Sequence, residues 1–195
     1  MTAPDGDFAP ADPSDGREPG DWKSRYPDAS ARRAILAESF YLGIIFVSAP
    51  IIALVLWLEY PKYWLHLSDA KYRTLFRYAI AWVSGTLGGT LFDIKWLYHS
   101  VAKYKWNLDR RLWRVFTPHI SGALSCAVVT LISSGILRVF DHRATESPSL
   151  VFALAFLVGY FSDNTIAKLA EVAGTLFGPI RPAEKGKESH GPKAS

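Results

Sequence analysis

The sequence predicts an all-α polytopic membrane protein with four transmembrane helices, a disordered acidic N-terminal tail and an amphipathic C-terminal helix. Three observations lead to this fold class. Four runs without charged residues, 39–58, 78–92, 115–137 and 147–162, take up much of the 195-residue chain. Two of them reach the length of about 20 residues that a helix needs to cross the hydrocarbon core. The other segments are short and polar, so no stretch is long enough for a separate soluble domain of ordinary size.

Residues 1–30 are expected to form a disordered cytoplasmic tail. This segment is rich in Asp, Pro and Gly and poor in large apolar side chains, so burial cannot offset the entropy of ordering it. Residues 1–28 hold seven acids and three bases, and the rest of the chain holds eleven acids and nineteen bases. The net charge of +4 therefore conceals an acidic leader and a basic remainder.

The helical domain is predicted over residues 31–178, with spans at about 39–59, 75–96, 118–138 and 149–168. Glu59-Tyr60-Pro61 ends the first span, and Thr117-Pro118 is expected to begin the third, because Thr is a good N-cap and Pro suits the first helical position. The fourth span either continues as an amphipathic helix to residue 177 or breaks at Ser162. Residues 179–195 are expected to form a disordered basic tail.

The distribution of bases predicts the orientation. With four spans, the N-terminal tail, the loop between spans two and three and the C-terminal part lie on one side and carry most of the Lys and Arg residues. Loops rich in these bases stay in the cytoplasm. We therefore expect a multi-pass protein of the cell inner membrane with both termini cytoplasmic.

No enzymatic signature is found, and we expect no enzyme activity and no cofactor. The sequence contains no phosphate-binding P-loop, no G-x-S-x-G, no H-E-x-x-H and no dinucleotide fingerprint. The five histidines have no metal-ligand spacing, and Cys126 is the only cysteine, so no metal site is expected.

Small residues recur every fourth position in two spans. Close approach of helix backbones at such positions is a common way for membrane helices to associate. This packing lies either within one protomer or between protomers of a homo-oligomer. The candidate packing residues are Ala81, Gly85, Gly89 and Gly122.

Hydroxyl and acidic side chains in the spans are candidates for an ion pathway. Ser125 and Thr130 belong to a hydroxyl-rich side of span three, which is either a packing seam or a pore lining. Charged groups at membrane depth are costly and are therefore functional candidates. Asp93 and Asp163 are expected near the cytoplasmic edge, as an acidic ring at a pore mouth, as a helix cap or as partners of neighbouring bases; Glu171 lies on the polar face that follows.

The loop between spans two and three is basic and aromatic. It can dock on membrane lipids, or it can bind an anionic cytoplasmic ligand such as a nucleotide or short oligonucleotide; no double-stranded nucleic acid is expected. In a further hypothesis, the acidic N-terminal tail folds against this loop or into a pore and inhibits the protein. The candidate residues are Lys103, Lys105, Trp106, Arg110, Arg111 and Arg114.

In layout, the chain resembles the small multi-span membrane effectors of bacterial anti-phage defence. The resemblance is carried by the acidic leader Asp5 to Asp28, the four spans, Lys103-Tyr104-Lys105-Trp106 and Arg110-Arg111-Leu112-Trp113-Arg114. It implies an oligomeric channel that a nucleotide-type signal opens, and it transfers no site residue.

We therefore expect an oligomeric pore or ion channel gated from the cytoplasm. The alternative is a non-conducting membrane scaffold or accessory subunit that docks a soluble partner through its basic aromatic loop. A small transporter is a third alternative, but the sequence lacks the internal repeat or paired broken helices expected of one.

Overall fold

The computed structural model describes residues 23–137 and 146–178, and every regular element in these ranges is helical. The all-α prediction is confirmed for this part of the chain. Residues 1–22 of the predicted N-terminal tail and the whole predicted tail 179–195 lie outside the described residues. The elements are α1 (Ala29–Trp57), α2 (Tyr60–Trp64), α3 (Asp69–Ala102), the 3₁₀ helix η1 (Leu108–Arg110), α4 (Arg111–Ser133), α5 (Pro148–Tyr160) and α6 (Ser162–Phe177).

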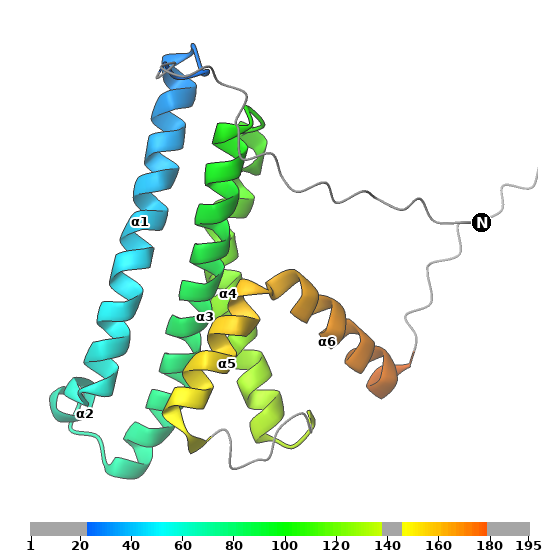
Figure 1. Ribbon diagram of the computed structural model, residues 1–195. Coiled ribbons are helices and arrows are strands. Elements are labelled where there is room, and N and C mark those ends of the chain that lie inside the picture. Colours follow the sequence, from blue (N-terminus) through cyan, green and yellow to red (C-terminus); the bar gives the residue numbers. More distant parts are fainter. Residues whose placement is uncertain (1–22, 138–145, 179–195) are drawn as a thin grey trace, which may run out of the picture. The chain divides into compact units, whose positions relative to one another are not determined.

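The chain divides into two compact units, residues 1–162 and 163–195. In the first unit, α3 is the central helix and packs against α1, α4 and α5, while α4 also packs against α5. Figure 1 shows α1 running beside α3, with the short helix α2 where α1 ends. The apolar core of this unit lies where α1, α3, α4 and α5 meet, around Ile80, Ala81, Val129 and Ala155.

Two helical segments are long and apolar enough to cross a membrane, namely α1 and Leu108–Ser133. A third candidate is the pair Pro148–Tyr160 and Ser162–Thr175, taken together as one interrupted span. The protein therefore has two such helices, or three, where the sequence predicted four spans. The difference lies at α3, whose charge-free run of 15 residues between Arg77 and Asp93 is rich in Gly, Ser and Thr.

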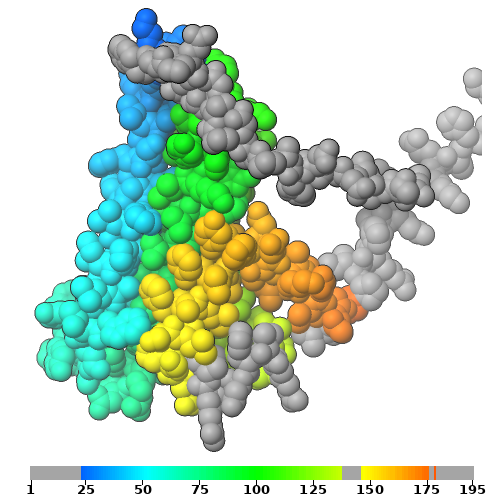
Figure 2. All heavy atoms as spheres, in the orientation of Figure 1, coloured from blue at the N-terminus to red at the C-terminus, as the bar shows by residue number. Residues whose placement is uncertain are grey.

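The outward face of α1 is strongly apolar. Large side chains recur along it, including Phe40, Ile44, Ile51, Leu54 and Leu58, each of them exposed. Figure 2 shows that other described segments leave most of this helix uncovered in the view. Soluble monomers rarely expose a continuous apolar surface of this extent. A membrane-embedded helix presents such a surface to lipid, so the apolar face fits the predicted membrane location of the protein.

Helix α4 begins at Arg111 rather than at the predicted Pro118, and this start is a correction. Pro118 lies inside a continuous helix, where it lacks the N–H that would bond to the Arg114 carbonyl. The Thr117 hydroxyl donates to the Trp113 carbonyl at 2.8 Å, as a hydroxyl inside a helix does, instead of capping a helix start. The predicted cap at Asn107 is confirmed, because its side chain accepts from the Asp109 N–H at 2.9 Å.

The fourth predicted span is interrupted. Helix α5 ends at Tyr160, the backbone at Phe161 is not helical, and α6 begins at Ser162. Of the two alternatives drawn from the sequence, the structure has the break near Ser162.

Candidate functional site

The small-residue faces pack inside one protomer. A Cβ added at Gly85 or Gly89 of α3 would overlap the Ser125 or Ser121 side chain of α4, and one added at Gly122 would overlap Thr86 of α3. Ala81 is completely buried in the apolar core. The sequence left open whether these small residues pack within one protomer or between protomers. The contacts described here lie within one protomer, so neighbouring helices of the same chain already cover Ala81, Gly85, Gly89 and Gly122.

Helix α5 completes this close packing through its own glycine. A Cβ added at Gly159 would overlap the backbone of Gly85, and one added at Gly88 would overlap the backbone of Phe156. The backbones of α3 and α5 are therefore in direct contact. The sequence shows Gly159 in an apolar run, but no local pattern indicates that its partner is Gly85, which lies in another helix 74 positions earlier in the chain.

Ser125 and Thr130, the predicted pore hydroxyls, lie in different environments. Ser125 is completely buried, and its hydroxyl lies 2.8 Å from the Ser121 carbonyl and 2.9 Å from the Ala155 carbonyl. It belongs to the packing seam between α4 and α5 and does not line an opening of the protomer. Thr130 is exposed, and its hydroxyl donates to the Cys126 carbonyl at 2.7 Å.

Asp93 is completely buried on α3. Tyr41 of α1 contacts α4 through its hydroxyl. The Tyr41 hydroxyl donates to the Val115 carbonyl of α4 at 2.9 Å and lies 2.8 Å from Nε2 of His119. Within one protomer the Asp93 carboxylate is closed off from the surface, while Tyr41 and His119 join α1 to α4.

A buried ion pair joins α1 to α4. The Arg114 Nε–H donates to Glu38 Oε2 at 2.8 Å, and the two side chains are 4% and 2% exposed. The Trp106 indole N–H donates to the same carboxylate oxygen at 3.1 Å, and a second Arg114 nitrogen donates to the Asn107 carbonyl at 3.1 Å. Arg114 and Trp106 were predicted to bind an anionic ligand or lipid. This role stays a prediction, and in the structure both side chains bind Glu38 instead.

Tyr26 anchors the end of the leader on the basic loop. Its hydroxyl accepts from the Trp106 backbone N–H at 3.1 Å, and its ring lies 4.8 Å from that of Tyr104, centroid to centroid. Residues 23–28 were predicted to be disordered, but Tyr26 is 8% exposed and packed. An aromatic residue near the end of a polar leader was the signal that could have indicated this contact. The autoinhibition hypothesis itself concerns mainly residues 1–22, which lie outside the described residues.

The other four basic residues of the loop are on the surface. Lys103, Lys105, Arg110 and Arg111 are all exposed, and none makes an ion pair with another residue in the described ranges. They lie close together in the chain, just before the buried Arg114. These four side chains, without Arg114, are the ones that can meet a phosphate, whether of a lipid or of a soluble ligand.

One outward face of α4 combines small and polar side chains with apolar ones. His119 and Thr130 lie about three helical turns apart and so share a face. The large apolar Phe116 and Ile120 are exposed on or beside this face, whose other exposed residues, His119, Ala123, Ala127, Thr130 and Ser134, are small or polar. Side chains of this kind gain little from contact with lipid tails and are typical of helix contacts or of water-facing surfaces in membranes.

Asp163 and Glu171 belong to the second compact unit. Asp163 is exposed in the first turn of α6, where a carboxylate interacts favourably with the helix dipole. Glu171 is exposed and paired with Lys168 at 2.9 Å. The acidic ring of Asp93 and Asp163 stays a prediction.

Within the described ranges, no group of three or more His, Cys, Asp or Glu side chains is placed to hold a metal ion. Comparison with known proteins assigns no family: no family model, curated protein or solved structure matches the chain.

Proposed function

We propose that the protein is an oligomeric ion-conducting membrane protein of the cell inner membrane. In this proposal α3 crosses the bilayer together with α1, α4 and α5, which it contacts, and thereby supplies the fourth crossing. The observation that carries the proposal is the outward face of α4, on which His119, Ala123 and Thr130 are exposed within a span. Such a face is unsuited to lipid and suited to a contact or water-filled path between protomers.

The packing of the protomer favours a path between copies over a path through one copy. The contacts of Gly85, Gly88, Gly89 and Gly159 bring α3, α4 and α5 to backbone distance and leave little space among them. Ions would therefore move along α4 at a protomer interface. A carboxylate such as that of Asp93, buried on the helix α3 that packs against α4, would favour cations in this path.

Gating would come from the exposed bases of the loop that precedes α4. Because this loop continues directly into η1 and α4, an anion that binds Lys105, Arg110 or Arg111 would act on the helix that carries the proposed path. A nucleotide-type ligand has the charge for this role. The anti-phage effector role implied by the resemblance stays a prediction.

Ion flux from liposomes tests the proposal. The full chain is reconstituted in K⁺-loaded liposomes, and K⁺ efflux is compared for wild type, Thr130→Trp and the matched variant Ile51→Trp on the lipid-facing side of α1. We expect efflux above that of protein-free liposomes, lost in Thr130→Trp and kept in Ile51→Trp. The flux is measured without a ligand and again with an oligonucleotide added. Conduction is contradicted if wild-type efflux does not exceed the protein-free background in either condition.

Crosslinking tests the proposed interface independently. In a Cys126→Ser background, Ala123→Cys is expected to form disulfide-linked dimers, whereas Leu54→Cys on the outer face of α1 is not. Equal crosslinking at both positions would indicate random collision and remove the interface.

A second candidate function is the non-conducting scaffold. The cluster of four exposed loop bases favours this function, because it suits docking of an acidic soluble partner. The small-residue faces also favour it, because they pack within the protomer and are not available to build an oligomeric pore. A silent flux assay combined with intact folding would favour this function.

A further inference from the structure

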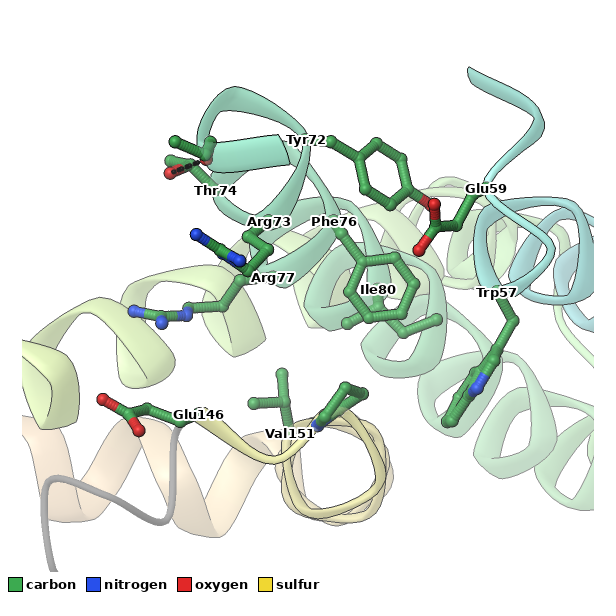
Figure 3. Close-up of a pocket in the computed structure, with 12 residues that line it drawn as sticks. Trp57, Glu59, Tyr72, Arg73, Thr74, Phe76, Arg77, Ile80, Glu146 and Val151 are labelled. Atoms are coloured by element: carbon green, nitrogen blue, oxygen red, sulfur yellow. Dashed lines mark hydrogen bonds between the residues drawn. The ribbon is translucent and has the colours of Figure 1, made fainter. Parts of the chain in front are cut away.

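A pocket of about 680 Å³ lies where α1 ends and α3 and α5 begin. Figure 3 shows the side chains that line it, among them Trp57, Tyr72, Arg73, Phe76 and Arg77. All of them belong to the first compact unit. The basic aromatic loop follows the other end of α3, so this pocket is separate from every site predicted from the sequence.

Two guanidinium groups lie on the same side of the pocket. Arg73 and Arg77 are one helical turn apart on α3, and Figure 3 shows both side chains extending to the same side. Neither forms an ion pair within 4.0 Å with a side chain of the described ranges. The nearby acids Glu59 and Asp69 are bound instead by Lys62, at 3.0 and 2.7 Å.

Glu146 limits the charge that the pocket can accept. It lines the pocket from the segment before α5, and Figure 3 shows it below the two arginines. The wall holds two guanidinium groups and two carboxylates, but Glu59 is already paired with Lys62. Glu146 then offsets one of the two arginines, and about one unit of positive charge remains for a ligand. This charge matches the single negative charge of a phosphodiester better than the higher charge of a free phosphate ion.

Apolar side chains form another part of the pocket wall. Trp57 and Phe76 make an edge-to-face contact with ring centroids 5.9 Å apart, and Ile80 and Val151 lie buried beside them. Such a wall can contact the glycerol and the upper acyl carbons of a lipid. Near this pocket, Tyr63 and Trp64 of α2 are strongly exposed, which is typical of side chains at headgroup level.

We propose that this pocket binds the phosphodiester headgroup of a membrane phospholipid, with Arg73 and Arg77 on the phosphate and the lipid backbone against Trp57 and Phe76. Guanidinium groups bind phosphate oxygens through paired charge-assisted hydrogen bonds. The site would hold the junction of α1, α3 and α5 at one membrane surface. It does not depend on ion conduction.

Native mass spectrometry of the full chain in detergent tests the site. The probes are phosphatidylglycerol, phosphate-free diacylglycerol and inorganic phosphate. We expect one phosphatidylglycerol per chain, bound at least about ten-fold more weakly by Arg73→Gln/Arg77→Gln, since two charge-assisted hydrogen bonds are lost. The variant Lys71→Gln removes an exposed charge from the same turn of α3 and should retain lipid.

The outcomes separate the sources of phosphate. Weak binding of diacylglycerol and no displacement by millimolar inorganic phosphate support a lipid headgroup. Displacement by inorganic phosphate that depends on Arg73 and Arg77 would overturn the lipid assignment. Equal binding by wild type and the double variant, or an equal loss in Lys71→Gln, would overturn the site. If the double Gln variant does not fold, Arg73→Lys/Arg77→Lys keeps the charge but loses the paired geometry, and unchanged binding there overturns the proposal.

Discussion

Glu38 of α1 and Arg114 of α4 form an ion pair that is almost completely removed from the surface of the protein, with 2.8 Å between Arg114 Nε and Glu38 Oε2. The two residues are 76 positions apart in the chain. The Trp106 indole N–H donates to Glu38, and the Asn107 carbonyl accepts from Arg114, so the loop before α4 is tied to α1 through this pair. The pair therefore links the outer helix of the bundle to the loop that carries the exposed bases.

Removal of one partner of this pair is expected to be strongly destabilising. Glu38→Gln leaves the Arg114 charge buried without compensation, which costs about 3–5 kcal/mol of unfolding free energy in comparable cases. Arg110→Gln, which removes an exposed charge from the same loop, should change stability little. Denaturant titration of the detergent-solubilised protein, followed by circular dichroism, measures both.

The double variant Glu38→Leu/Arg114→Met separates charge burial from packing. Because no charge remains buried, its stability should lie close to that of the wild type. If Glu38→Gln and Arg110→Gln unfold at the same denaturant concentration, the pair does not contribute to stability as the structure indicates.

Backbone contact between α3 and α5 predicts a large effect of a single methyl group. In Gly159→Ala, the new Cβ meets the backbone of Gly85, which has no flexible side chain to move aside. We expect a loss of about 1–3 kcal/mol from overpacking. Gly43→Ala is the matched control, because nothing lies within 4 Å of a Cβ at Gly43. There, the better helix propensity of Ala should leave stability unchanged or slightly higher.

Thermal unfolding of both glycine variants in the same detergent provides the measurement. A Gly159→Ala protein as stable as Gly43→Ala would mean that α3 and α5 do not approach as closely as described. Dimer formation is measured in the same samples. Because Gly159 packs within the protomer, Gly159→Ala should lower the stability of the monomer as well as that of any dimer.

The sequence predicted the helices better than their partners. Charge-free runs and the Asn107 cap correctly placed most helical segments, because apolar periodicity and capping are local properties. The pairing of Glu38 with Arg114 depends on tertiary structure, and no local pattern indicates it. The start of α4 was misplaced for a related reason, since Pro118 suits both a helix start and a helix interior that neighbouring groups accommodate.

The site residues divide in the same way. Gly85, Gly89 and Gly122 were recognised as packing residues, but a spacing of four positions does not reveal which helix they face. Ser125 and Thr130 lie in the same helix and share a chemistry, yet one is buried and the other exposed. The Arg73 and Arg77 pocket was not predicted, because its wall combines residues from α1, α3 and the segment before α5.

The turn between α1 and α3 predicts a weak dependence of stability on acid. Hydrogen bonding to Lys62 lowers the pKa of the Asp69 carboxyl below its ordinary value, and hydrogen bonds to Asp69 and Glu59 raise the pKa of Lys62. The contribution of Asp69 is present above the carboxyl pKa of the unfolded chain, about 3.9, and is lost as the pH falls through the lower pKa of the folded state. That of Lys62 is lost only as the pH rises above about 10.4.

Thermal unfolding at pH 7 and at successive values below 4 measures this contribution. Asp69→Asn should lower the melting temperature slightly at pH 7 and show a smaller further decrease with acid than the wild type, because the groups are exposed and solvent screens them. Asp28, whose pKa is lowered mainly by the Ser30 hydroxyl, is a second acid with the same sign of effect. Identical acid profiles of wild type and Asp69→Asn would contradict a role for the Lys62 contact.

The charge distribution predicts which end of the bundle faces the cytoplasm. The loop between α3 and α4 carries the exposed bases Lys103, Lys105, Arg110 and Arg111, and positively charged loops are retained on the cytoplasmic side. Leu108 at this end and Leu65 at the other are matched positions, 56% and 52% exposed. In a Cys126→Ser background, Leu65→Cys should react with a membrane-impermeant thiol reagent in intact cells. Leu108→Cys should react only after the membrane is opened, and the reverse pattern would invert the proposed topology.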